Sequence, residues 1–412
     1  LNFVQVKCLK WIFRRREIGL THKNRTLGDI SNFASLCTAL SATLGTGNIV
    51  GIAVAVSVGG PGTLFWLALS SFFSLALKYC EGFLSIRYRQ IGSDGKIAGG
   101  PMYYIEQGLH SKFLAKLFAF FGTCVALIGI GTLVQTNSIA AAASSLGISN
   151  FITAIILGII VGVIIFGGIH RIAEVAKKVV PAMTVFYIVA AIWILISRVG
   201  MILPALKLII TDAFHPQAFV GGGCGIALIH VIQTGISRGI FCHESGLGSA
   251  AIASAAAKVD NGYEQGMISM IGAFMSIIVC VITGLVLIVT ADETHLFSST
   301  CEIPTTLLTA YAFGNGLGIL ALGFHVVNIS ILFFAFTTII GWNYYGEKCV
   351  QYLISTKAIP YYRMLFLFFV VIGPFLRIKT AFVIADIVIG LMAIPNIISL
   401  IMLRKEIVKG TV

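Results

Sequence analysis

The chain has 412 residues, of which 58% are hydrophobic and only 11% are charged. Soluble domains carry about 25% charged residues, so this composition excludes an ordinary soluble protein and indicates a helical protein that crosses a membrane several times. The net charge of +12 is the kind of value that suggests nucleic-acid binding in a soluble chain, but the positions of the basic residues give it another explanation. The nine cysteines include no Cys-x-x-Cys pair, so we expect no metal centre or disulfide framework.

Residues 1–30 are basic and amphipathic, and we expect them to lie on the cytoplasmic membrane surface. Ten apolar spans are predicted after them, and a short basic cytoplasmic tail, 404–412, follows the last. The third and sixth spans are too long for one straight crossing, so they must be tilted, extended past the bilayer or interrupted. The predicted spans are 32–57, 62–85, 114–145, 151–168, 176–199, 219–257, 265–290, 316–345, 361–377 and 380–403.

Ten spans place both ends of the chain on one side, and the basic residues indicate which side. If the ends are cytoplasmic, 22 of the 28 Lys and Arg residues fall in cytoplasmic segments and 4 in outer segments. This distribution follows the positive-inside rule and accounts for the net charge without nucleic acid. We therefore expect a multi-pass protein of the bacterial inner membrane, with both termini of this chain in the cytoplasm and the lipid bilayer as its main partner.

The first span is interrupted by Ser41-Ala42-Thr43-Leu44-Gly45-Thr46-Gly47-Asn48. Glycine weakens a helix, and threonine and asparagine can bind the backbone groups that a break releases. The free N–H groups of such a break attract a carboxylate and its free C=O groups bind a cation, so the segment is suited to an amino-acid zwitterion. The alternative is close helix packing through Gly47-x-x-x-Gly51.

A second interruption lies in the sixth span, between Thr234 and Ser249. Five spans are an odd number, so two halves of five spans, 31–200 and 219–403, would have opposite orientations in the membrane. Interrupted helices at matching positions of two inverted halves indicate the binding site of a secondary transporter. We therefore predict an all-α polytopic membrane protein of about ten transmembrane helices, in a 5+5 inverted repeat with two discontinuous helices.

Further polar side chains lie within the apolar spans. Thr337 and Thr338 are adjacent in mid-span and either supply oxygen ligands to a hard cation beside the first break or bond back to the preceding turn. Trp342, one turn further on, either closes a small pocket or anchors the helix at the interface. The polar cluster Gln135, Asn137 and Ser138 either faces the cavity or joins helices.

Four ionisable residues are candidates for gating or coupling. Asp386 lies within the tenth span, where a charge is functional by default. Arg238 and Glu244 in the second break either pair with each other or leave Arg238 as part of a cytoplasmic gate. His243 is a candidate for proton coupling, because histidine titrates near neutral pH. Lys78 and Glu81 have the spacing of a local ion pair.

Several ordered motifs resemble the alanine or glycine:cation symporter family, also called sodium:alanine symporters, over nearly the whole chain. They are Ala39 to Ile49, Gly59-Gly60-Pro61-Gly62, Gly99 to Ile105, Gln135-Thr136-Asn137-Ser138, Arg238 to Ser249, Phe336 to Cys349 and Gly390 to Asn396.

The resemblance implies a leucine-transporter-type fold and Na⁺-coupled uptake of a small neutral amino acid such as alanine or glycine, with no enzymatic activity, no cofactor besides Na⁺ as the coupling ion, and no obligate protein partner. It also implies an additional span before the first residue of this chain. Substrate would contact Thr46, Gly47, Asn48, Gln135, Gly239, Phe241 and Trp342, and Na⁺ would contact backbone oxygens at Ser41 and Leu44 with Thr337 and Thr338.

One departure concerns the second break. The family usually reads Ser-Asn-Glu-Ala-Gly where this chain has Cys242-His243-Glu244-Ser245-Gly246. An H⁺-coupled amino-acid symporter that uses His243 is therefore an alternative. An ion channel is an alternative of a different class, although the repeated filter segments that a channel requires are not visible in the sequence.

Overall fold

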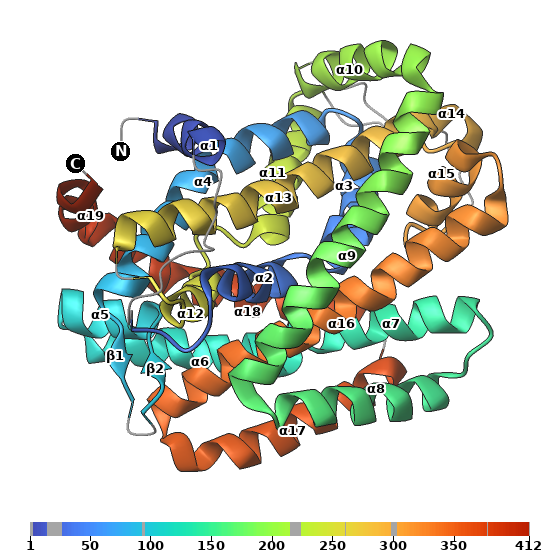
Figure 1. Ribbon diagram of the computed structural model, residues 1–412. Coiled ribbons are helices and arrows are strands. Elements are labelled where there is room, and N and C mark those ends of the chain that lie inside the picture. The colour runs from blue at the N-terminus through green and yellow to red at the C-terminus, as the bar shows by residue number, and fades with distance from the viewer. Residues whose placement is uncertain are drawn as a thin grey trace.

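The computed structural model describes residues 3–14, 27–92, 95–214, 224–259, 261–297, 303–376 and 378–411. These residues are almost all helical, as the sequence predicted (Figure 1). The sheet in the described part of the chain is one antiparallel hairpin of β1 (Gln90–Ile91) and β2 (Ile97–Ala98). Parts of the predicted basic segment, 1–2 and 15–26, and the predicted start of the second half, 219–223, lie outside the described residues.

The described residues before 215 form eleven helices or helical turns, and the last of them, α10, lies beyond the predicted fifth span. They are α1 (Val4–Arg14), α2 (Asn32–Thr43), η1 (Thr46–Asn48), α3 (Val50–Gly59), α4 (Thr63–Arg87), α5 (Pro101–Leu109), α6 (Lys112–Ile128), α7 (Leu133–Ser145), α8 (Asn150–Ile165), α9 (Gly168–Ser197) and α10 (Val199–Phe214).

The second half repeats the pattern of a broken span followed by long helices. Its elements are α11 (Cys224–His243), α12 (Ser249–Ala255), α13 (Gly262–Val289), α14 (Ala291–Thr294), α15 (Leu308–Leu317), α16 (Leu320–Leu353), η2 (Thr356–Ala358), α17 (Ile359–Ile372), η3 (Gly373–Phe375), α18 (Ile378–Met402) and α19 (Arg404–Thr411).

Seven helices in the described residues are long and apolar enough to cross a membrane, and α2 with η1 and α3 makes an eighth if the broken pair is one span. The apolar helix α8 is shorter, at 16 residues, and the sixth span is divided between α11 and α12. The protein is therefore an integral membrane protein, whereas the count of ten spans stays a prediction.

Both predicted discontinuities are present. The two parts of the first span are bent by 65° at the break, and residues 244–248 separate α11 from α12 in the sixth. The long third span is also interrupted, because residues 129–132 separate α6 from α7. Each break contains glycines, which accept irregular backbone at low steric cost, and protein covers each of them, as an irregular segment within a bilayer requires.

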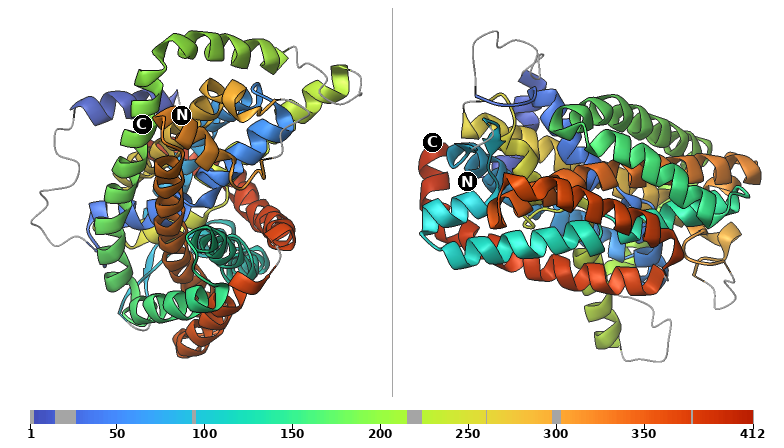
Figure 2. Two further views of the ribbon diagram at one scale, coloured as in Figure 1. Left: turned by 90° about the vertical axis from the view of Figure 1, so that its right-hand side faces the viewer. Right: turned by 90° about the horizontal axis from the view of Figure 1, so that it is seen from below.

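The two ends of the helical bundle carry different elements. The hairpin, α5 and α19 gather at one end, beside the ends of the chain, and α10, α14 and α15 lie at the other (Figures 1 and 2). The helix α10 lies outside the ten spans predicted from the sequence. The buried carboxylate of Asp212 fixes this helix to the turn before α4 by accepting a hydrogen bond from Gly62 N–H at 2.8 Å, and Trp66 Nε1–H donates to Ala213 O at 2.9 Å.

Candidate substrate and cation site

The end of α2 presents carbonyl oxygens that have lost their helical donors. In a continuous helix Gly45 N–H would bind the Ser41 carbonyl, but it donates to Asn48 Oδ1 at 3.0 Å. Asn48 N–H would bind the Leu44 carbonyl, but it donates to Gly45 O at 3.2 Å. The break therefore leaves the oxygens of Ser41 and Leu44 available to groups outside the helix.

The hydroxyl of Thr338 on α16 lies against these oxygens. Its Oγ1 is 3.0 Å from Ser41 O and 3.2 Å from Leu44 O, and it is also 2.9 Å from Phe334 O in the preceding turn of α16. One hydroxyl hydrogen can serve only one of three acceptors. The two α2 carbonyl oxygens that lack helical donors, those of Ser41 and Leu44, and the Thr338 hydroxyl oxygen are all buried and form a group that suits a hard cation.

Thr337 does not join this group. Its hydroxyl donates to Phe334 O at 3.1 Å and contacts Met183 Sδ on α9 at 3.7 Å. Adjacent helical residues project about 100° apart, so only one of two neighbouring threonines can face the break. The sequence prediction that both hydroxyls serve one cation is therefore corrected: Thr338 faces the break, and Thr337 bonds back to its own helix and faces α9.

The opposite side of the first break presents groups suited to a carboxylate. Thr46 N–H donates to Gln135 Oε1 on α7 at 3.4 Å, so Gln135 faces the break, which is one of the two alternatives for the polar cluster. The hydroxyl oxygen of Thr46 is buried without a hydrogen-bond partner. Asn137 takes the other alternative and joins helices, because it donates to carbonyls at Gly373 and Leu376. Ser138 matches neither alternative, because its hydroxyl donates to Val134 O in its own helix.

Asn48 joins the two breaks. Its Nδ2 donates to Ser276 Oγ at 2.7 Å, with Cys242 O at 3.5 Å and Cys280 Sγ at 3.1 Å, and Ser276 Oγ donates to the same Cys242 carbonyl at 2.8 Å. Gly47 lies directly against Phe241 of α11, since a Cβ at this position would lie 3.1 Å from the Phe241 ring. The geometry thus brings Thr46, Gly47, Asn48, Gln135 and Phe241 together.

Two predicted substrate contacts lie elsewhere. Gly239 packs against α4, where a Cβ would meet Ser70 Oγ at 3.0 Å and Ser71 Oγ at 3.1 Å. Trp342 is buried and donates from Nε1 to Glu244 Oε1 at 3.2 Å, so its polar atom serves the second break. Gly239 thus faces α4 and the polar atom of Trp342 faces the second break, whereas the resemblance implied that both contact the substrate.

Arg238 does not pair with Glu244. Its guanidinium lies over the Phe241 ring, 5.7 Å from the centroid, and within electrostatic range of Asp386 on α18. Arg238 is partly exposed and Asp386 is exposed. Arg238 lies on α11, which runs to the break from the end of the bundle where α10 lies, and its part in a gate stays a prediction.

Lys78 and Glu81, predicted from their spacing to form a local ion pair, both bind the backbone of the second break. Glu81 on α4 accepts hydrogen bonds at Oε1 from Gly246 N–H at 2.8 Å, Gly248 N–H at 2.9 Å and Asn396 Nδ2 at 2.9 Å. Lys78 donates to the Glu244 carbonyl at 3.1 Å. A charge in an apolar span was the available signal, but its partners on the distant second break were not predictable.

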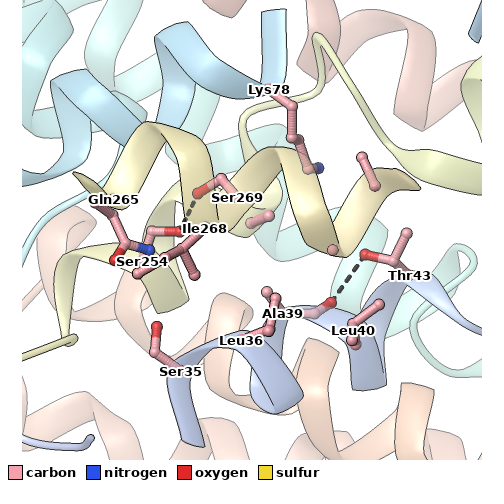
Figure 3. A pocket seen from close by; sticks show the side chains of 13 residues that line it. Ser35, Leu36, Ala39, Leu40, Thr43, Lys78, Ser254, Gln265, Ile268 and Ser269 are labelled. Atoms are coloured by element: carbon pink, nitrogen blue, oxygen red, sulfur yellow. Dashed lines mark hydrogen bonds between the residues drawn. The ribbon is translucent and has the colours of Figure 1, made fainter. Parts of the chain in front are cut away.

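A small cavity lies beside this cluster, between α2, α4, α12 and α13 (Figure 3). Its volume is about 10 Å³, enough for about one water molecule. Lys78 lines it together with Gln265, whose Oε1 is buried without a partner, and the hydroxyl pair Ser254 and Ser269, 3.1 Å apart. The cavity is thus lined by polar groups from α2, α4, α12 and α13, and it lies beside the part of α2 that precedes the first break.

Comparison with known proteins agrees with this geometry. The model of the sodium:alanine symporter family matches residues 1–411.

The chain belongs to the sodium:alanine symporter family.

Its curated relatives cover the whole length of the chain. An uncharacterized transporter of Haemophilus influenzae is 46% identical over 100% of this chain and 89% of its own. The sodium/alanine symporter AgcS of Methanococcus maripaludis is 43% identical over 100% and 90%, and the probable sodium/glutamine symporter GlnT of Bacillus subtilis is 33% identical over 99% and 83%. The protein is thus a membrane transporter and not an enzyme.

Two solved structures share the fold. The crystal structure of MhsT in complex with L-phenylalanine is 12% identical, with a TM-score of 0.65 over 94% of this chain and 93% of that one. A manganese transporter of Eremococcus coleocola is 13% identical, with a TM-score of 0.52 over 96% and 83%. At such identities the likeness concerns the fold alone, and it is the leucine-transporter-type fold that the motifs implied.

Proposed function

We propose that this transporter carries a small neutral amino acid, alanine or glycine, into the cell together with Na⁺. Na⁺ binds the carbonyl oxygens of Ser41 and Leu44 with the hydroxyl of Thr338, and substrate binds across the two breaks. The two halves of the chain, 31–200 and 219–403, then move against each other to expose the site to either side of the membrane in turn.

The observation that carries this proposal is the group of oxygens around Thr338. Three carbonyl oxygens lie between 2.9 and 3.2 Å from one hydroxyl that has a single hydrogen. The group bridges α2 and α16, so a cation bound there pulls the end of the first break onto the long helix. Cation binding then orders the same backbone segment whose N–H groups face the substrate, which is a direct physical route to coupling.

The junction between the breaks favours a small substrate. Gly47 lies so close to the Phe241 ring that even one added methyl group is crowded. The N–H groups and the Thr46 hydroxyl of the first break bind the carboxylate, and the ammonium group lies toward the free carbonyl groups. The relative AgcS is a sodium/alanine symporter, which supports alanine, whereas the relative GlnT is a probable sodium/glutamine symporter, whose substrate has a larger amide side chain.

Proton coupling through His243 is not favoured by the geometry. The ring is buried, with Nδ1 accepting a hydrogen bond from Ser245 N–H at 3.1 Å and Nε2 at 3.1 Å from Ser74 Oγ. An imidazole that accepts at Nδ1 is neutral and carries its hydrogen at Nε2. A second proton at Nδ1 would lose the bond to Ser245, so His243 serves better as a structural link between α4 and the second break.

The orientation in the membrane follows from the positive-inside rule. The hairpin, α5 and α19 face the cytoplasm with the ends of this chain, and α10, α14 and α15 face the outside of a bacterial inner membrane.

The proposed function is tested by uptake of labelled alanine into proteoliposomes that contain the purified chain. We expect uptake only with an inward Na⁺ gradient, and competition by unlabelled glycine and alanine but much less by leucine or glutamine. Liposomes in which K⁺ replaces Na⁺ are the control. Alanine uptake of equal rate in the two salts would exclude Na⁺ coupling, and stronger competition by glutamine than by glycine would exclude the proposed substrate.

A further inference from the structure

Three ionisable side chains meet at the second break in complete burial. Lys78 is 2% exposed, and Glu81 and Glu244 are each 1% exposed. If all three were ionised, the group would hold two negative charges and one positive. Buried ions need a counter-charge or neutralisation, so the position of the lysine decides which carboxyl group must be neutral.

Glu81 is the carboxylate that the lysine neutralises. Its Oε2 is 3.8 Å from Lys78 Nζ, and its Oε1 accepts three N–H donors, from Gly246, Gly248 and Asn396. Every one of these groups is a hydrogen-bond donor, and hydrogen bonds of this kind stabilise the ionised form of a carboxyl group.

Glu244 has a different environment. Lys78 binds its backbone oxygen at 3.1 Å, and the described residues place no cation within ion-pair distance of its carboxyl group. The carboxyl oxygens contact neutral partners: Oε1 accepts from Trp342 Nε1 at 3.2 Å, and Oε2 is 2.6 Å from Ser249 Oγ. A hydroxyl can accept as well as donate, so Ser249 can receive a hydrogen bond from a protonated Oε2.

We propose that Glu244 is a proton-binding site: its carboxyl group carries a proton in this conformation, with Oε2–H donating to Ser249 Oγ. The proton exchanges with solvent when the cytoplasmic side opens. The water-sized cavity that Lys78 lines lies beside this cluster.

The other titratable groups around Glu244 do not supply the missing charge. His243 on the same helix is neutral by its hydrogen bonds. Tyr344 and Tyr345 on α16 and Tyr104 on α5 are phenols, and Tyr104 donates to Asn396. The charged residues that face Glu244 are therefore Lys78 and Glu81 on α4, which already neutralise each other.

The position of Glu244 connects its proton to the substrate site. It occupies a left-handed backbone conformation at the end of α11, with φ at 53°, two residues after Cys242, whose carbonyl oxygen binds Ser276 and Asn48. Loss of the proton leaves two carboxylates for one lysine, which disfavours the closed second break. High pH should therefore disfavour this conformation and slow the transport cycle; this consequence rests on the proposed function, whereas the protonation itself does not.

Infrared difference spectroscopy of the purified chain tests the protonation without any transport assay. We expect the carbonyl band of a protonated carboxyl group at neutral pH, with a shift in D₂O, and its loss in Glu244→Gln. Glu106→Gln is the matched control, because Glu106 is half-exposed and lies near Lys112, and there the band should persist. The absence of such a band in the unmodified chain, or its survival in Glu244→Gln, would overturn the proposal.

Two further measurements use the same variant. Glutamine can accept from Trp342 and donate to Ser249 as a protonated glutamate does, so Glu244→Gln should melt within a few degrees of the unmodified chain at neutral pH. A large loss of thermal stability would argue for an ionised Glu244.

In proteoliposomes, alanine transport should fall as pH rises from about 6 to about 9, because a buried carboxyl group loses its proton in about this pH range. That fall should disappear in Glu244→Gln and persist in His243→Asn. The reverse pattern would assign the proton to His243. If the unmodified chain does not transport alanine, the proposed function fails while the spectroscopic result stands.

Discussion

Through the Thr338 hydroxyl, α16 contacts the carbonyl oxygens at the end of α2 that form the proposed cation site. This hydroxyl touches two carbonyl oxygens of α2 and one of its own helix. Its neighbour Thr337 has the same chemistry and faces Met183 instead. The pair therefore offers a matched comparison in which one hydroxyl faces the first break and the other does not.

Thr338→Ala should weaken Na⁺ binding by about tenfold or more, which corresponds to about 1.4 kcal/mol, because it removes one oxygen ligand and leaves its carbonyl partners uncompensated. The Na⁺ concentration that gives half-maximal alanine uptake measures the effect. Thr337→Ala is the control and should change that concentration by less than about threefold. Equal effects of the two substitutions would contradict the assignment of the cage.

Gly47 provides a second test at the scale of a single residue. A methyl group at this position would lie 3.1 Å from the Phe241 ring, whereas one at Gly51 on α3 would meet no heavy atom within 4 Å. Gly47→Ala should therefore lower the apparent affinity for alanine by about tenfold, and that for glycine by less, because the displaced ring takes space from the substrate methyl group. Gly51→Ala should leave both affinities unchanged. Competition by unlabelled alanine and glycine measures them, and equal losses for the two substrates would argue against a size limit here.

At the scale of elements, α11 is held against α4 by small residues. A Cβ on Gly235 would lie 2.7 Å from the Thr63 carbonyl oxygen and 2.8 Å from Trp66 Cβ. Gly239 lies one turn further along the same contact. Small residues let two helices approach closely, and in a bilayer such packing is a main source of helix association. The two glycines therefore allow α11, the first half of the second broken span, to pack closely against α4.

Gly235→Ala should reduce stability by about 1–3 kcal/mol, because the contact atom is backbone and cannot move aside easily. Gly390→Ala on α18 is the comparison, since a Cβ there would meet nothing within 4 Å; it should raise stability by up to about 1 kcal/mol through helix propensity. Thermal melting in detergent orders the three proteins. A Gly235→Ala variant as stable as the unmodified chain would show that α11 is not closely seated.

At the scale of the whole molecule, a strip of backbone closes the bundle at the end that carries the hairpin. The N–H groups of Asp29 and Ile30 donate to Ala256 O at 2.9 and 3.1 Å, and Lys258 N–H donates to Ile30 O at 2.9 Å. Arg89 binds the same strip, with Nη1 2.8 Å from Ala257 O and Nη2 2.7 Å from Val259 O. The start of the first broken span and the end of the second are thus joined at this end of the bundle, which is the predicted cytoplasmic end.

Arg89→Ala should loosen this closure, because it leaves the carbonyl groups at the end of α12 without their charged donor. Hydrogen–deuterium exchange should rise by about tenfold in residues 28–36 and 249–259. Lys116→Ala, which removes an exposed charge from α6 near the same end, should leave exchange in these segments unchanged. Unaltered exchange in Arg89→Ala would mean that the backbone strip alone holds the two spans together.

Much of the architecture could be predicted because a bilayer imposes strong constraints. Apolar runs must be helices, basic loops select a side, and a polar, glycine-containing interruption must be covered or line a site. These rules were sufficient for the all-α fold and for the two broken spans with Thr46 and Asn48 at the first break, whereas the place of Gln135 came only from the family resemblance. The length of the third span predicted tilt, extension past the bilayer or interruption, and the structure has the interruption.

The direction of each side chain around the breaks was decided by tertiary structure. Thr337 and Thr338 cannot be distinguished in sequence, and only the packing of α16 against both α2 and α9 gives one of them the cation cage. Glu81 reads as a local partner of Lys78, yet its carboxylate holds the backbone of the second break. Periodicity shows that a residue is buried; which neighbour it meets depends on how distant helices pack, and hydrogen bonds and charges act only over those final distances.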